Sequence, residues 1–171
     1  NLNKNNFFTD VSNYLSYETG QPTHCYDAFK INKKLSLIEI NKTTEFETLL
    51  DKKITIQKGE LVFSQNKDII NLAGIIGGKT TSCSKNTSSV IVECAYFRPE
   101  AIINNALEHG IQSDAAHKFE RGTDRESHED VLRRFIHIVN EHAQIKNIGL
   151  VSYNSKEHKF ITIPYDPELV N

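Results

Sequence analysis

The chain has 171 residues, enough to bury about 70% of the surface exposed by its unfolded form, so it needs neither a disulfide framework nor a structural metal. Its 38% hydrophobic and 25% charged residues are typical of an ordinary soluble protein, and its apolar runs are too short to span a membrane. The net charge of −2, from 20 basic and 22 acidic residues, excludes a broad surface for a long nucleic acid, but not contact with the tip of one.

The cysteine and methionine content further restricts the class of protein. Cys25, Cys83 and Cys94 include no CxxC pair and are odd in number, which argues against disulfides and a cysteine zinc site and favours a reducing cytoplasm. Because the sequence contains no methionine, it lacks an initiator of its own. We therefore expect a piece of a longer polypeptide, with further domains outside it.

The first third predicts one helix and an extended loop. Asp10 is expected to cap the helix, and Gly20 follows its C-terminus. Pro22 keeps the next segment, which contains His24, out of a helix.

The middle of the chain reads as β structure. Residues 35–40 and 89–95 have the β-branched or alternating pattern of strands. Two hairpins are expected between them, turning at 51–53 and 66–68. Their strands are 48–50 with 54–56, and 61–63 with 69–73.

The last third reads as helices followed by strands. Pro99 begins a predicted helix that stops at Gly110, and Ser113 caps a short helix ending at Gly122. The capping-box spacing of Thr123 and Glu126 precedes the longest helix. Residues 148–153 and 160–163 are expected to be closing strands.

These elements indicate an α+β domain in four segments. Residues 1–34 are a helix and loop, 35–97 are β-rich, 98–163 are helical with closing strands, and 164–171 lead to the next domain. No internal repeat is found.

Glu93 is the unusual residue of the strand at 89–95. It shares one face of that strand with Ile91 and Ala95, and an ionised carboxylate among apolar neighbours is costly unless it has a partner. Two interpretations stay open: an edge carboxylate paired with Lys or Arg, or a carboxylate kept for a ligand. We expect Glu93 and the glycine cluster at 74–78 to form opposite walls of a small pocket.

The glycine cluster is not a phosphate loop. Gly78-Lys79-Thr80 matches the end of that pattern, but Ala73 stands where its first glycine is required. The cluster therefore serves either a tight turn or the close approach of a ligand.

His24 is the candidate for polar chemistry in the first third. His24 and Cys25 are adjacent in an extended segment and point to opposite sides, which argues against a thiol hydrolase. His24 alone could orient a water or a substrate group, or be an ordinary surface histidine. The other histidines lack metal-ligand spacing, so no metal is assigned.

Five motifs occur in order along the chain: DVSNY at 10–14, GQPTH at 20–24, AGIIGGKT at 73–80, ECAYF at 93–97 and SDAAHKFERG at 113–122. In this order and spacing they resemble the central editing module of the bacterial phenylalanyl-tRNA synthetase beta subunit. The resemblance implies a three-layer β/β/α arrangement with a β-sandwich-like core and helices packed on one side. It also implies hydrolysis of tyrosine wrongly esterified to the phenylalanine tRNA.

The resemblance assigns roles to five residues. Glu93 would accept the phenol hydroxyl of tyrosine, because a site that requires this hydroxyl rejects phenylalanine by leaving a buried acceptor unpaired. Gly77 would line the pocket, and Ser113 and Ala115 would bound it. His24 would be the catalytic residue that orients a water or the terminal adenosine.

The resemblance also implies partners and cofactors. The acceptor end of the phenylalanine tRNA and the synthetase alpha subunit are expected partners, in a cytoplasmic heterotetramer without membrane contact. ATP and magnesium are expected for the whole synthetase, and no cofactor for this module. Three departures from the family pattern occur: Ser113 replaces a threonine, Ala116 replaces a serine, and no arginine stands near Asn3.

Two alternatives to editing remain. The first is a non-catalytic module of the same synthetase that positions tRNA or the partner subunit. The second is an unrelated small-molecule hydrolase that uses His24 and Glu93.

Overall fold

A computed structural model describes residues 5–32, 34–153, 162–166 and 168. The described part is mixed α+β, with helices and several small antiparallel sheets, as expected. None of its helices is long and apolar enough to cross a membrane. The region of Asn3 lies outside the described residues.

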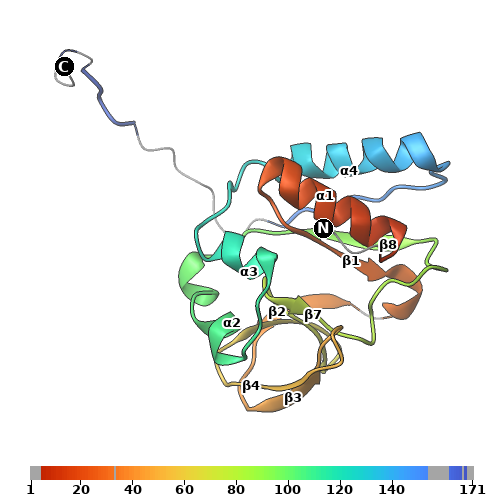
Figure 1. Ribbon diagram of the computed structural model, residues 1–171, viewed down its shortest axis with the longest axis vertical. Helices are drawn as coiled ribbons and strands as arrows, with labels where there is room; N and C mark the ends of the chain where they lie inside the picture. Colours follow the sequence, from red (N-terminus) through yellow and green to blue (C-terminus); the bar gives the residue numbers. More distant parts are fainter. Residues whose placement is uncertain (1–4, 33, 154–161, 167, 169–171) are drawn as a thin grey trace.

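Two helices and a two-stranded sheet form one part of the fold. Helices α1 (Phe7–Thr19) and α4 (His128–His142) pack on each other and on strands β1 (Thr23–Asp27) and β8 (Val90–Cys94), as Figure 1 shows. Their shared apolar core consists of Val11, Leu15, Cys25, Phe135 and Val139.

The predicted ends of these helices are partly wrong. Asn6, not Asp10, caps α1, with its side chain accepting the backbone N–H of Thr9 at 3.1 Å. Gly20 follows α1 in the left-handed conformation, as predicted, at φ 79°. Ser127 precedes α4, so the expected capping box at residues 123–126 does not form.

A second group of strands lies on the other side of β1 and β8 from α1 and α4 (Figure 1). Its four-stranded sheet has the order β2 (Leu35–Glu39), β5 (Leu61–Gln65), β6 (Asp68–Leu72), β7 (Ile76–Gly77). The predicted hairpin of β5 and β6 is confirmed, and Asn66 provides the positive φ of 59° in its turn.

The other hairpin is displaced from its predicted position. Strand β3 (Thr44–Glu47) pairs with β4 (Lys53–Ile56), so residues 48–50 belong to the turn rather than to a strand. Thr48 closes this turn by donating its N–H to the carbonyl of Lys52, and Asp51 takes a positive φ of 59°. The apolar pair Leu49-Leu50 had suggested a strand, but the conformation that the turn requires determines the structure of these residues.

Two short helices lie beside the four-stranded sheet. The predicted helix 99–110 is broken into a 3₁₀ turn, Pro99–Ala101, and α2 (Asn105–Glu108), because Asn104 adopts a φ of 72°. Helix α3 (Asp114–Phe119) forms as predicted, with the Ser113 hydroxyl accepting the N–H of Ala116 at 3.3 Å.

The predicted closing strands are not found among the described residues. Residues 143–153 form neither helix nor strand, so the strand at 148–153 is wrong. Of the strand at 160–163, residues 160 and 161 lie outside the described residues, and 162–163 are not in a strand.

Candidate functional site

The antiparallel pairing of β1 and β8 brings the two main candidates together. His24 stands directly opposite Glu93 in the register, and Tyr26 stands opposite Ile91. Because directly paired residues project on the same face, these four side chains face away from α1 and α4. Cys25 lies on the other face, in the core beneath α1, so the predicted separation of His24 from Cys25 is confirmed.

Glu93 has a tyrosine as its partner rather than a cation. The Tyr26 hydroxyl donates to Oε2 of Glu93 at 2.5 Å, and Asn71 Nδ2 donates to the same hydroxyl oxygen at 2.8 Å. Within the described ranges, no Lys or Arg forms an ion pair with Glu93. The interpretation of Glu93 as an edge carboxylate in a salt bridge is therefore wrong.

Gly77 lies against His24. A Cβ built on Gly77 would collide with Cε1 of His24 and come within 2.8 Å of its Nε2 and 3.1 Å of Leu49 Cδ2. Gly77 is also paired with Asn71 across β6 and β7. The two sheets therefore face each other here, with His24 on Gly77 and Tyr26 on Asn71.

The other glycines of the cluster have separate neighbours. Gly74 has a φ of 71°, and a Cβ there would lie 2.8 Å from Ile102 and 3.0 Å from Phe97. A Cβ on Gly78 would lie 2.7 Å from the Ile70 carbonyl. These glycines allow close packing between elements, and their side-chain space is filled by the protein itself.

Ser113 and Ala115 belong to α3, which is tied to both parts of the fold. Ser113 is the helix cap described above, and Ala115 packs on the core that contains Tyr26. Lys118 of α3 donates to the carbonyl and the hydroxyl of Ser16 in α1, at 2.5 and 2.7 Å. The aromatic series Phe119, Phe97, Phe63 and Tyr26 links α3 to the site through ring centroids 4.9, 6.3 and 6.5 Å apart.

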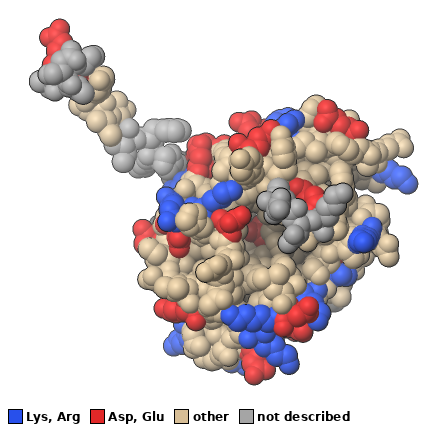
Figure 2. Space-filling model, viewed as in Figure 1, with Lys and Arg blue, Asp and Glu red and all other residues tan. Residues whose placement is uncertain are grey.

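The protein surface is hollowed near these elements. Figure 2 shows a hollow close to the point where α3, β1 and β7 approach one another in Figure 1. His24 and Glu93 are partly, not fully, buried. Two cavities of about 350 and 240 Å³ lie elsewhere, along β4 and along β3, and neither is lined by the candidate residues.

Burial sets the ionisation of the site. Loss of solvent lowers the pKa of His24 to about 4, so its imidazole is neutral at pH 7. Burial raises the pKa of Glu93 to about 7, and the hydrogen bond from Tyr26 opposes that rise. Burial, with the nearby Glu93, also raises the pKa of Tyr26 well above its usual value, so this phenol remains a donor.

Two buried polar atoms at the site have no partner among the described residues. They are Nε2 of His24 and Oδ1 of Asn71. Buried polar atoms are normally hydrogen-bonded, so each of these two atoms marks a place where a ligand or water is expected. Among the described residues, no group of His, Cys, Asp and Glu could hold a metal ion.

Sequence reasoning missed Tyr26 and Asn71. Tyr26 follows His24 by two residues, so the strand period already placed both on one face. Asn71 is a polar residue within the apolar strand β6, the same signal that singled out Glu93.

Comparison with known proteins agrees with the motif pattern. The model of the B3/4 domain matches residues 1–144. Three phenylalanine–tRNA ligase beta subunits are similar: that of Fusobacterium nucleatum is 34% identical over 82% of this chain, that of Psychrobacter arcticus 33% over 92%, and that of Zymomonas mobilis 32% over 94%. The chain spans 18 to 20% of the length of these relatives. The resemblance is confirmed: the chain belongs to the B3/4 domain family, and the relatives that share the domain are phenylalanine–tRNA ligase beta subunits.

Proposed function

We propose that this chain is the editing module of a phenylalanine–tRNA ligase beta subunit and hydrolyses tyrosine wrongly esterified to the phenylalanine tRNA. The observation that carries the proposal is Glu93. It is a partly buried carboxylate without a cation among the described residues, stands opposite His24, and already accepts one phenol hydroxyl. Such an acceptor fits the group that distinguishes tyrosine from phenylalanine.

The physical need for this site is selectivity. A pocket shaped for a phenylalanine ring rejects a ring that adds a hydroxyl by only about a hundredfold. A second site that requires the hydroxyl reverses the preference, because phenylalanine would desolvate Glu93 and leave the carboxylate oxygen that Tyr26 does not bind without a donor, at a cost of about 1–3 kcal/mol or more.

His24 is proposed to orient rather than to take a proton. A histidine with a pKa near 4 is a weak base at pH 7, but its neutral ring still offers a lone pair. Its Nε2 is buried without a partner among the described residues, so we assign it to a water or to the terminal adenosine. The ester is activated by its adjacent ribose hydroxyl, so positioning a water is the main requirement.

Gly77, Ser113 and Ala115 complete the proposed pocket. The absence of a side chain at Gly77 leaves room for the ring of His24, and Ser113 and Ala115 stand at the N-cap and in the first turn of α3. The three-layer β/β/α arrangement is part of the same proposal. It is supported by α1 and α4 on one face of β1 and β8 and by the remaining strands on the other.

The wider setting is proposed from the relatives. The acceptor end of the tRNA and an alpha subunit are the proposed partners, and the cytoplasm the proposed location. ATP and magnesium belong to the proposed aminoacylation reaction of the whole enzyme, not to this module.

A second function has its own support. A module that only positions tRNA or the alpha subunit is favoured by a site that the protein fills itself: Tyr26 occupies one oxygen of Glu93, and the ring of His24 fills the space beside Gly77.

Deacylation of tyrosyl-tRNA bearing the phenylalanine anticodon separates the two functions. The assay uses the intact ligase that contains this chain and its His24→Ala and Glu93→Ala variants. His137→Ala and Glu141→Ala are the matched controls, since these residues form an exposed His–Glu pair on α4 with 3.6 Å between their N and O atoms. Editing requires that the natural enzyme and the controls clear the ester and that the site variants do not. A natural enzyme that leaves the ester intact establishes the positioning module instead.

A further inference from the structure

The Glu93 carboxylate, which is proposed to bind the phenol hydroxyl of the substrate, already accepts a hydrogen bond from the phenol hydroxyl of Tyr26. The Tyr26 hydroxyl has a single hydrogen, which points to Oε2 of Glu93, and its oxygen accepts a hydrogen from Asn71. The direction of both bonds is therefore fixed: the amide donates to the phenol, and the phenol donates to the carboxylate.

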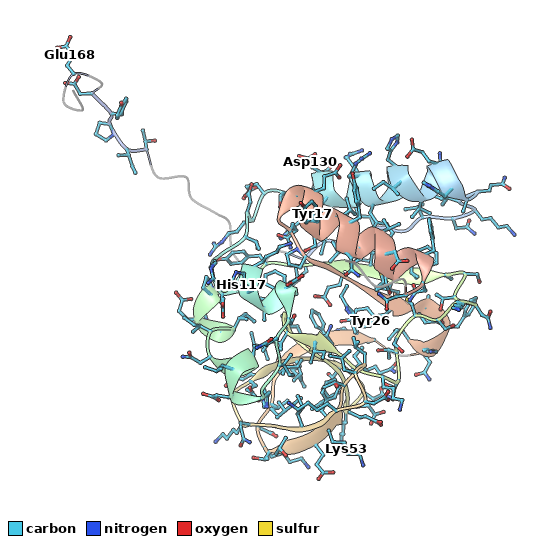
Figure 3. The ribbon with its side chains drawn as sticks, in the orientation of Figure 1. Tyr17, Tyr26, Lys53, His117, Asp130 and Glu168 are labelled. Carbon is cyan, nitrogen blue, oxygen red and sulfur yellow. The ribbon has the colours of Figure 1, made fainter. Side chains whose placement is uncertain are left out.

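Tyr26 is fixed by burial and by ring contacts. Its side chain is fully buried, and Figure 3 shows it between the β1–β8 pair and the four-stranded sheet. Its ring meets the ring of His24 edge to face, with centroids 4.5 Å apart, and also meets the ring of Phe63, with centroids 6.5 Å apart. Burial and these ring contacts restrain the Tyr26 side chain and keep its hydroxyl on Glu93.

The second oxygen of Glu93 remains available. Across the described residues, Oε1 of Glu93 receives no hydrogen bond from the protein, and the residue keeps some exposure to solvent. The titratable groups around it are His24 and Tyr26 on β1 and the thiols of Cys25 and Cys94, and none of them is a cation at pH 7. Among the described residues no donor satisfies this oxygen, so it is open to a donor from a ligand.

We propose that Tyr26 is a positioning residue for substrate selection: its hydroxyl, anchored by Asn71, fixes Oε2 of Glu93 and leaves Oε1 to accept the phenol hydroxyl of the substrate. This inference rests on the proposed editing function and adds a residue to it. A carboxylate held by one oxygen has one orientation for its other oxygen, which makes the acceptor rigid.

Tyr26 also favours the ionised carboxylate. Its donated hydrogen bond lowers the pKa of Glu93 against the effect of burial. An ionised acceptor forms the stronger bond with a phenol, so loss of the Tyr26 hydroxyl weakens tyrosine recognition most at neutral and acidic pH.

The test compares Tyr26→Phe with the natural protein in the intact ligase. The ratio of tyrosyl-ester to phenylalanyl-ester hydrolysis is measured from pH 6 to 8.5. The variant keeps the buried ring, and we expect its ratio at pH 7 to fall about tenfold, with partial recovery at high pH. Tyr14→Phe is the matched control, because Tyr14 donates to Glu18 at 3.0 Å on the exposed face of α1. An unchanged ratio and pH profile in Tyr26→Phe overturn the proposal.

A second measurement keeps this outcome separate from failure of the editing function. The 171-residue chain contains every partner named above, and its Glu93 carboxyl carbon is titrated by carbon-13 NMR, with Glu93→Gln identifying the signal. We expect a higher midpoint in Tyr26→Phe than in the natural chain. Equal midpoints overturn the role of Tyr26 even when tyrosyl-tRNA is cleared, whereas failure of the natural enzyme to clear the ester counts against the editing function alone.

Discussion

His24 and Glu93 are directly paired across two antiparallel strands, although they lie in the first and the middle parts of the chain. Burial acts on their ionisation in opposite directions: it favours the neutral imidazole and the protonated carboxyl. Each of these two pKa shifts therefore makes the free energy of unfolding depend on pH in its own way. A substitution at one residue measures the contribution of that residue separately.

Glu93→Gln should change how stability depends on pH above the usual carboxyl range. The folded pKa of Glu93, about 7, lies above its ordinary 4.5, so the folded state holds a proton that the unfolded state releases between these values. The free energy of unfolding of the natural chain therefore falls as pH rises through this window, by up to about 3 kcal/mol, and the glutamine variant is free of this loss. Urea denaturation should show the variant gaining stability relative to the natural chain between pH 4.5 and 8. A constant difference would contradict the buried carboxyl.

His24→Gln should act in the opposite direction at acidic pH. The folded pKa of His24, about 4, lies below its ordinary 6.5, so the unfolded state takes up a proton first as pH falls. The contribution of the neutral imidazole to stability is complete above 6.5 and is lost towards pH 4, by up to about 3 kcal/mol. The same denaturation series should show His24→Gln gaining relative stability from pH 6.5 to 4. His137→Gln, on the exposed side of α4, should change it by less than about 0.5 kcal/mol.

Gly77→Ala should be enough to disable the proposed site. The added methyl collides with the ring of His24, so the imidazole must move or the sheets must separate, at a cost of about 1–3 kcal/mol. We expect clearance of the tyrosyl ester to fall at least about tenfold if the imidazole moves. Gly149→Ala is the control, because a Cβ there meets nothing within 4 Å. Normal clearance in Gly77→Ala would remove Gly77 from the pocket. Gly77→Trp should abolish clearance altogether.

His109→Ala should destabilise the fold without touching the site. His109 Nε2 lies 2.8 and 3.0 Å from the carboxylate oxygens of Glu60, and both side chains are almost fully buried. Loss of the imidazole leaves a buried carboxylate with only the N–H of Gln57 among the described residues, at a cost of about 2–3 kcal/mol. Thermal unfolding measures this loss. An effect no larger than that of His137→Ala would mean that water replaces the imidazole.

Ser113→Ala tests whether Ser113 acts through the helix or through the pocket. Its hydroxyl caps α3, so alanine should cost about 1 kcal/mol of stability, and threonine should restore most of it. Chemical denaturation gives the stability, and tyrosyl-ester hydrolysis gives the activity. Unchanged stability with lost activity would assign Ser113 to the pocket alone.

The local sequence determined the elements whose signals are local. Gly20 and Gly122 follow helices with positive φ because glycine enters that conformation without strain, and Ser113 caps α3 as its position before Asp114 suggested. The length and β-branched content of residues 89–95 predicted the strand, and the alternation of strand side chains predicted the face of Glu93. The five motifs predicted the family. Errors arose where two local signals competed, as at Leu49-Leu50 and at Asn104.

Only the tertiary structure decided what surrounds the candidate residues. The partner of Glu93 is a buried tyrosine from β1, anchored by an asparagine from β6, and no spacing along the chain specifies a contact between three strands. The space beside Gly77 is filled by His24 because two sheets pack face to face there. Sequence patterns report the period of one element, whereas hydrogen bonds and burial between elements depend on how those elements pack, and that packing sets the chemistry of this site.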